Sequence, residues 1–366
     1  MIKMHLFWPI LIIFITSGCQ SLENPQQHIL YMGWDENSVL QLFTFEVATQ
    51  ESEQLTRLED GISEYQLAGN QREVAYVSNN QNQISQIWLM TLNGRFRPTS
   101  NENILSCENS NCAQLVWAPD GRRLIYEKRS VENGAMGQPS LWWLDTETGN
   151  TIDVLPDVDK PASAASISPD GKWLTYNVSS EERVYGFNFE NGRFIFIQGA
   201  MGTPTVWHPT NDTFLINDLN IAVLHGDEGD DHQEHSHDFA ESVHLFNVEV
   251  LAERRNALTE AAQVDDASPT YSPDGEWILF GRKLVRTNTG RQLWLMRADG
   301  SEKQALTDSI NIHHSVVSWS GNGRFILYQM IDLLDNSKPP SLWMMEIESG
   351  EKTRLIENGI QGRWIQ

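Results

Sequence analysis

Short runs in which apolar and polar residues alternate fill most of the chain, with turns rich in Pro, Asp, Asn and Gly between them. A period of two is the pattern of a strand with one buried face. Three turns have the same form, Pro119-Asp120-Gly121, Pro169-Asp170-Gly171 and Pro273-Asp274-Gly275. Pro sets φ at the second position of a type I turn and Gly is favoured at the fourth. Because apolar runs flank each turn, each predicts the tip of a hairpin.

The turns belong to a repeat that extends over residues 28–366. Strong or weak copies of the run before the turn lie at positions 67, 117, 167, 207, 271, 319 and 364. After each hairpin comes a second motif, such as Ser140-Leu141-Trp142 or Ser341-Leu342-Trp343, then a Gly-containing turn and a polar run. A period of roughly 40–50 residues made of strands indicates a propeller. One unit is predicted to be four antiparallel strands, a, b, c and d in chain order.

The two ends of the chain predict how the ring closes. Residues 28–33, 39–45 and 53–56 have the patterns of b, c and d strands, with no a strand before them. Residues 360–365 have the pattern of an a strand, with no b strand after it. We therefore expect an all-β, seven-bladed propeller of four-stranded antiparallel blades, closed by the C-terminal strand pairing with the N-terminal blade. Closure leaves only short, protected strand edges.

The Ser-Pro-Asp-Gly units resemble the repeats of TolB-like propellers, which are related to WD-type repeats. The resemblance covers residues 28–366, and it is specific for the fold because the turn recurs in phase with the strands. Such propellers serve in transport machinery, peptidase gating domains, sensors and a few lyases, so the resemblance leaves the biochemical task open. TolB also has an amino-terminal domain, whereas here a short segment leads almost directly into the first blade.

The first residues have the pattern of an export signal. Lys3 precedes an apolar run from Leu6 to Ile15, which is too short to span a bilayer of about 30 Å. Small residues then lead to Cys19, as in the bacterial lipobox. We predict a lipoprotein signal peptide at 1–18, a lipid anchor at Cys19 and a tether at 19–27; a secretory signal with an incidental Cys19 is the alternative. The predicted location is the extracytoplasmic (periplasmic) side of the cell envelope, at the outer membrane if two membranes are present.

Charge and cysteine content narrow the choice of partners. The chain has 26 Lys and Arg against 49 Asp and Glu, a net charge of −23. This argues against nucleic acid and against a basic patch that binds anionic lipid, so membrane contact is expected through the lipid anchor only. Outside the cytoplasm, Cys107 and Cys112 are expected to form a disulfide, with two free thiols as the alternative. A monomer is expected.

Histidines provide the candidate chemistry. The segment 225–238 holds His232, His235 and His237 among acidic residues, which are possible ligands for zinc or a similar divalent metal. A solvated loop is the alternative interpretation. His313 and His314 form a second candidate in the d–a connection before the last full blade. Propeller lyases similar to this repeat class hold a divalent metal with several histidines, whereas a protected core or rim pair is the alternative here.

The b–c and d–a connections of such blades share one face, which we expect partners to use. It would gather the segments 107–112, 129–139, 218–242 and 331–340. The tryptophans are expected to pack between blades rather than to form a sugar-stacking platform. They occupy inner strands at Trp117, Trp207, Trp319 and Trp364, and c strands at Trp88, Trp142, Trp294 and Trp343.

No G-x-S-x-G, G-x-x-x-x-G-K or H-E-x-x-H motif is present in the sequence. The preferred hypothesis is a non-enzymatic propeller that binds an envelope protein or a peptidoglycan-associated partner. The alternatives are a metal-dependent propeller enzyme of the carbohydrate-lyase kind, or a metal or pH sensor that uses residues 225–238.

Overall fold

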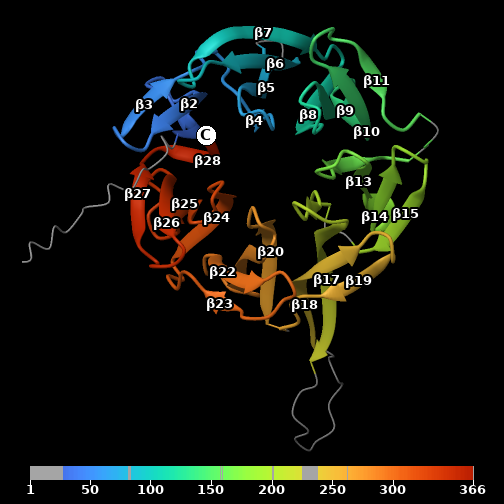
Figure 1. Ribbon diagram of the computed structural model, residues 1–366, viewed down its shortest axis with the longest axis vertical. Helices are drawn as coiled ribbons and strands as arrows, with labels where there is room; N and C mark the ends of the chain where they lie inside the picture. Colours follow the sequence, from blue (N-terminus) through green and yellow to red (C-terminus); the bar gives the residue numbers. More distant parts are fainter. Residues whose placement is uncertain are drawn as a thin grey trace, which may run out of the picture.

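The computed structural model describes residues 28–80, 84–156, 158, 160–199, 202–224, 238–261 and 263–365. Within these ranges, 28 strands form seven four-stranded antiparallel sheets, which are arranged as blades in a ring around a central axis (Figure 1). The predicted all-β, seven-bladed propeller is confirmed. In the same ranges, one short 3-10 turn, Ser179–Glu181, is the only helical element.

Each blade runs from the channel to the rim in the order a, b, c, d (Figure 1). The first four blades are β28 (Gly359–Ile365), β1 (His28–Trp34), β2 (Leu40–Glu46), β3 (Glu51–Gln54); β4 (Glu64–Leu67), β5 (Glu73–Asn79), β6 (Ser85–Leu92), β7 (Pro98–Ser106); β8 (Ser110–Trp117), β9 (Arg123–Glu132), β10 (Ala135–Asp145), β11 (Thr151–Asp153); and β12 (Ser163–Ile167), β13 (Trp173–Val178), β14 (Arg183–Asn188), β15 (Phe194–Gln198). The last three are β16 (Val206–Trp207), β17 (Thr213–Leu224), β18 (Asp238–Glu249), β19 (Arg254–Ala257); β20 (Val264–Tyr271), β21 (Trp277–Leu284), β22 (Gln292–Arg297), β23 (Gln304–Ala305); and β24 (Ile312–Trp319), β25 (Phe325–Asp332), β26 (Ser341–Glu346), β27 (Lys352–Ile356).

The repeated turn joins strands a and b and also links neighbouring blades. Ser168 Oγ accepts the backbone N–H of Trp173 at 2.9 Å and donates to Asp170 Oδ1 at 2.6 Å. Gly171 has φ of +73°, which favours glycine, and a Cβ there would lie 3.7 Å from the Pro119 ring of the preceding blade. The turn residues therefore fix the hairpin and bring successive turns into contact around the channel.

The Ser-x-Trp motif in strand c is also explained by a local hydrogen bond. Ser140 Oγ and Ser341 Oγ each accept the indole N–H of the Trp two residues later, at 3.0 Å. Residues two apart lie on the same face of a strand, so the spacing makes this bond possible. The bond satisfies the polar tip of Trp142 or Trp343 while the ring packs against an inter-blade core.

The hydrophobic core lies between successive blades. The b strands place large aromatic side chains there at equivalent positions, all of them fully buried: Tyr76, Tyr126, Tyr176, Phe280 and Tyr328. Each belongs to a cluster that joins side chains of neighbouring sheets. Burial of this kind stabilises the ring because every blade needs a neighbour to cover its face.

Inner strands carry β-bulges that face the channel. The pairing register shifts within β8, β12, β20, β24 and β28. In four of these strands the bulge contains a non-glycine residue with positive φ, at Gln114, Ala164, Ser268 and Gln361. Bulges bend a strand and increase its twist, which here lets the inner strands curve around the axis.

The ring closes where β28 pairs with β1, with Ile365 opposite His28 and Trp364 opposite Ile29. The Tyr65 hydroxyl of the second blade shares its one hydrogen between the carbonyl oxygens of Leu30, at 2.9 Å, and of Gln361. Because the Tyr65 side chain contacts both strands of the closing pair, it stabilises their pairing from the neighbouring blade.

None of the described residues forms a helix with the length and apolar character needed to cross a membrane. The predicted leader, Cys19 and the tether lie outside the described residues, so they stay predictions.

Candidate functional site

The propeller has two unlike faces. The a–b and c–d turns form one, which we call the turn face, and the b–c and d–a connections form the opposite one, the loop face. Two long hairpins extend the loop face: β9 with β10, whose tip is at Asn133 and Gly134, and β17 with β18, which pair from Thr213↔Glu249 to Leu224↔Asp238. The predicted loop at 129–139 is thus largely a hairpin. The second hairpin reaches beyond the ring at the bottom of Figure 1.

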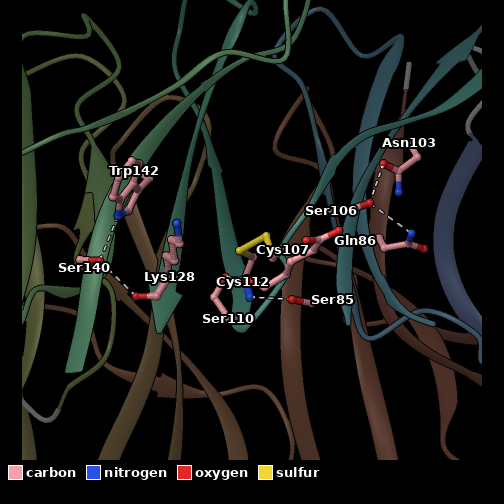
Figure 2. Close-up of a disulfide and its surroundings, with 11 residues drawn as sticks. Ser85, Gln86, Asn103, Ser106, Cys107, Ser110, Cys112, Lys128, Ser140 and Trp142 are labelled. Carbon is pink, nitrogen blue, oxygen red and sulfur yellow. Dashed lines mark hydrogen bonds between the residues drawn. A yellow bond between two sulfur atoms is a disulfide. The ribbon is translucent and has the colours of Figure 1, made fainter. Parts of the chain in front are cut away.

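The predicted disulfide is present and joins Cys107, in the d–a connection after β7, to Cys112 in strand β8. Figure 2 shows it beside Ser85, whose hydroxyl accepts the Cys112 N–H at 2.7 Å. Both cysteines are buried among Ala75, Ile87 and other core residues. The bridge therefore belongs to the core between the second and third blades.

Exposed apolar side chains gather on the loop face. Ten large hydrophobic residues among those described are strongly exposed, and six of them are on this face. The six are Met136, Leu219, Leu284, Ile310, Leu333 and Leu334. Single exposed apolar residues are ordinary, whereas a concentration on one face marks a surface for interaction.

Three of these residues, Ile310, Leu333 and Leu334, form what we call the apolar ridge. The Gly290 N–H donates to the Ile310 carbonyl at 2.6 Å, and the Leu333 N–H donates to the Asn311 carbonyl at 2.9 Å. These bonds join the loops of the sixth and seventh blades. The backbone segments that carry the three exposed residues are therefore held beside one another.

Leu334 is 76% exposed although its loop is well ordered by hydrogen bonds. Asp332 Oδ1 accepts the Leu334 N–H at 3.0 Å, and Asp332 Oδ2 is 2.8 Å from Lys338 Nζ. The Lys338 bond is the main reason that the pKa of the Asp332 carboxyl lies below its usual range. A large apolar side chain held outward by a fixed loop is suited to contact another molecule.

A buried polar network lies near the loop-face ends of the fifth and sixth blades. Asp266 is fully buried and accepts two bonds from the Arg282 guanidinium, at 2.7 and 2.8 Å. Arg282 also lies 4.6 Å from the centre of the Trp294 ring. Nearby, the buried His244 Nε2 is 2.9 Å from Ser242 Oγ, and burial lowers the pKa of this histidine.

His313 and His314 are the first residues after Ile312 in β24, within the inner strand, and not in the connection where the sequence placed them. Burial lowers the pKa of His313, and the neighbouring Arg291 and Lys283 lower it further. His314 is buried, with Nδ1 3.3 Å from the Arg291 carbonyl oxygen. Cationic neighbours make His313 a poor ligand for a metal cation.

Acidification should destabilise the protein through His314. Burial lowers the pKa of this side chain from 6.5 to about 4. The folded state therefore holds a neutral ring, and this contribution is complete above pH 6.5 and is lost as the pH falls toward 4. At 1.36 kcal/mol per pKa unit the loss is about 3 kcal/mol. Urea unfolding at pH 7 and pH 4.5 measures it; His314→Gln should show a smaller decrease, and equal decreases in the two proteins would contradict the assignment.

Metal ligation was the second sequence hypothesis. The described part of the chain contains no group of three or more His, Cys, Asp or Glu side chains arranged to hold a metal ion. His232, His235 and His237 lie outside the described residues, so their metal site stays a prediction.

The inner strands of several blades line a cavity of about 500 Å³ with both polar and apolar side chains. Glu64 Oε1 accepts the N–H of Leu115 at 3.3 Å, at the bulge of β8. Burial raises the pKa of this carboxyl. Gln66, Trp117 and Arg363 also line the cavity. Sequence patterns placed these residues on inner strands but did not show that they meet.

The Leu333-Leu334 pair is the signal that the sequence analysis missed. Two leucines stand between Asp332 and Asp335 in a polar connection, where nothing in the strand pattern calls for an apolar residue. An apolar pair in a polar connection is the sequence signal of exposed apolar surface.

These features define an all-β, seven-bladed propeller with an elaborated loop face, and its fold is similar to that of TolB. No family model matches the chain. It is 25% identical over 202 residues to the uncharacterized peptidase YuxL of Bacillus subtilis, and 24% identical over 207 residues to the uncharacterized protein Atu1656 of Agrobacterium fabrum. The matches cover 47% and 53% of this chain, and 29% and 57% of the lengths of these two curated relatives.

Solved structures share the fold at low sequence identity. TolB from Acinetobacter baumannii is 16% identical, with a TM-score of 0.51 over 89% of this chain and 79% of that chain. The propeller domain of the Trilobed protease from Pyrococcus furiosus is 11% identical, with a TM-score of 0.60 over 90% and 94%. That domain is described as having an open velcro topology, whereas β28 closes the ring here.

Proposed function

We propose that this protein is an envelope lipoprotein, anchored through Cys19, whose propeller is a non-enzymatic module that binds a protein partner with its loop face. The observation that carries the proposal is the apolar ridge: three exposed hydrophobic residues on loops that are joined and ordered by hydrogen bonds. Binding there would bury Leu334, which now contacts solvent, at little cost in loop ordering.

The charge of the molecule fits a selective surface. A net charge of −23 repels other acidic proteins at long range. An apolar surface within an acidic body favours a partner that brings complementary hydrophobic and basic groups. The predicted anchor at Cys19 would hold the propeller at a membrane of the envelope, close to a partner in the same compartment.

Affinity capture from detergent-solubilised envelopes tests the binding surface. The native lipoprotein should retain a partner, and Leu334→Glu should lose it, because the charge would be buried against an apolar contact. Leu251→Glu is the matched control, since Leu251 is similarly exposed but lies on the turn face. Identical sets of captured proteins from both variants would overturn the loop-face assignment.

Membrane fractionation tests the anchor. Cys19→Ala should move the protein from the membrane fraction to the soluble fraction and abolish labelling by a fatty acid. Unchanged fractionation and labelling would remove the lipoprotein part of the proposal and leave the binding surface to be judged by the capture experiment.

A further inference from the structure

The outer strand of the fourth blade, β15, lies at the rim of the ring (Figure 1) and carries two exposed phenylalanines. Its side chains alternate strictly: Ile195 and Ile197 are buried in the inter-blade core, while Phe194 and Phe196 are 49% and 56% exposed. The alternation fixes the register of the strand, so the aromatic side chains cannot turn inward without exposing both isoleucines.

The other outer strands carry the features that protect sheet edges from pairing, namely charged residues, proline or short length. Two of them, β11 and β23, have only three and two residues. The other four carry blocking residues: Glu51 and Glu53 in β3, Pro98 and Glu102 in β7, Arg254 and Arg255 in β19, and Lys352 and Arg354 in β27. In contrast, β15 is five residues long and contains neither a charge nor a proline.

The backbone of β15 directs hydrogen-bonding groups outward at the phenylalanines. The Gly199 N–H donates to the Glu182 carbonyl at 2.8 Å, which sets the phase of the ladder with β14. Because antiparallel ladders alternate, Ile195 and Ile197 bond to β14, and Phe194 and Phe196 direct their N–H and C=O groups away from it. The Gln198 carbonyl already accepts Arg255 at 2.6 Å, so the open part of the edge is centred on Ile195.

Neighbouring side chains hold the two rings in place. The Arg183 guanidinium lies 4.8 Å from the centre of the Phe196 ring, and the Phe187 ring centre lies 4.7 Å from that of Phe194. Ordered aromatic side chains lose little conformational freedom when a partner covers them.

Charged residues stand at both ends of the strand and not along it. Arg193, before the strand, is paired with Glu253 at 2.7 Å. At the other end, Arg183 is opposite Gln198, whose carbonyl accepts Arg255. The edge from Phe194 to Ile197 is uncharged, so the like charges that give the molecule its net charge of −23 do not lie on the pairing segment itself.

We infer that β15 pairs antiparallel with β15 of a second copy of this chain, around a two-fold axis at Ile195. Phe194 then lies opposite Phe196 of the second copy, and the two residues exchange backbone hydrogen bonds in both directions. All four phenylalanine rings share one face, where cross-strand aromatic pairs add to the stability of the joined sheet. This rim surface is separate from the loop face, so the inference stands apart from the proposed function.

Cysteine cross-linking in intact cells tests the pairing and its register. Two differently tagged copies are co-expressed, one with Phe194→Cys and one with Phe196→Cys; a mixed disulfide dimer is expected, because opposed residues have Cα atoms about 5.5 Å apart. Cells with only one of the variants are the matched control. Equivalent residues of the two copies would be about 8 Å apart, too far for a disulfide. No mixed dimer, or equal yields from the single variants, would overturn the inference.

Sedimentation of the full chain with Cys19→Ser, in the absence of micelles, tests association independently of the cysteines. A dimer is expected, and Phe196→Lys should shift it to the monomer. Ile152→Lys is the control, because Ile152 is exposed on the neighbouring outer strand β11 and should leave the dimer intact. A wild-type monomer at tens of micromolar, or dissociation by Ile152→Lys as well, would contradict the pairing.

Discussion

A chain that ends at Asn358 is expected to lose its cooperative unfolding transition. The deletion removes β28, including the buried Trp364 and Ile365, and leaves β1 without its inner neighbour. Removing one such side chain costs about 3–5 kcal/mol for Trp and about 2–5 kcal/mol for Ile, and the strand contributes backbone bonds as well. Domains have only about 5–15 kcal/mol of net stability, so little should remain.

Thermal unfolding followed by circular dichroism measures this effect. The control is Arg363→Ala, which changes a side chain of the same strand that lines the channel, and it should keep the melting temperature within a few degrees. If the truncated chain melted like the full chain, the ring would not depend on its closing strand.

Asp266→Ala is expected to cost about 3–5 kcal/mol of unfolding free energy, since it leaves the charge of Arg282 without its partner in a buried site. The carboxylate is fully buried and accepts two bonds from the guanidinium, while only 15% of the Arg282 side chain is exposed. The effect should far exceed that of an ordinary polar substitution.

Urea unfolding at pH 7 measures the Asp266→Ala effect. Glu53→Ala is the control, because Glu53 pairs with Arg97 where both side chains are about half exposed, and exposed pairs contribute within about 1 kcal/mol. A loss of similar size in the two variants would show that the buried pair has no special role.

The blades could be predicted because their signals are local. Each Ser-Pro-Asp-Gly turn makes its own hydrogen bonds, and each Ser-x-Trp strand satisfies its own indole. The strand patterns at the two ends of the chain then predicted that the C-terminal strand completes the N-terminal blade. The bounds of the polar d strands were predicted less accurately: residues 53–56 were expected as a strand, while β3 spans Glu51–Gln54.

The bulges of the inner strands were outside the reach of sequence patterns. Gln114, Ala164 and Ser268 have positive φ without being glycine, so no residue type marks them. Their cause is the curvature that seven sheets need around one axis, which is a property of the assembled ring. The same limit affected His313 and His314, because strand β24 extends further toward the loop face than its alternation indicated.

The sequence predicted which connections lie on the same face of the propeller, but not which of their residues form the candidate binding surface. Because antiparallel strands alternate in direction, alternate connections of a blade lie on one face, which the sequence pattern could predict. The apolar ridge depends on backbone bonds between separate connections, such as that from the Leu333 N–H to the Asn311 carbonyl. The Asp266–Arg282 pair depends on the register of β20 with β21, in which these two residues are directly opposite.

The closing pair also sets the order in which the protein can be completed. As the chain leaves the ribosome, β1 is the first of the described strands to emerge and β28 is the last of them, so the blade that begins with β28 is completed after the other six. Until β28 has been synthesised, β1 presents an unpaired edge that other chains or chaperones could occupy. The ring can therefore close only in a late step, which joins strands made at very different times.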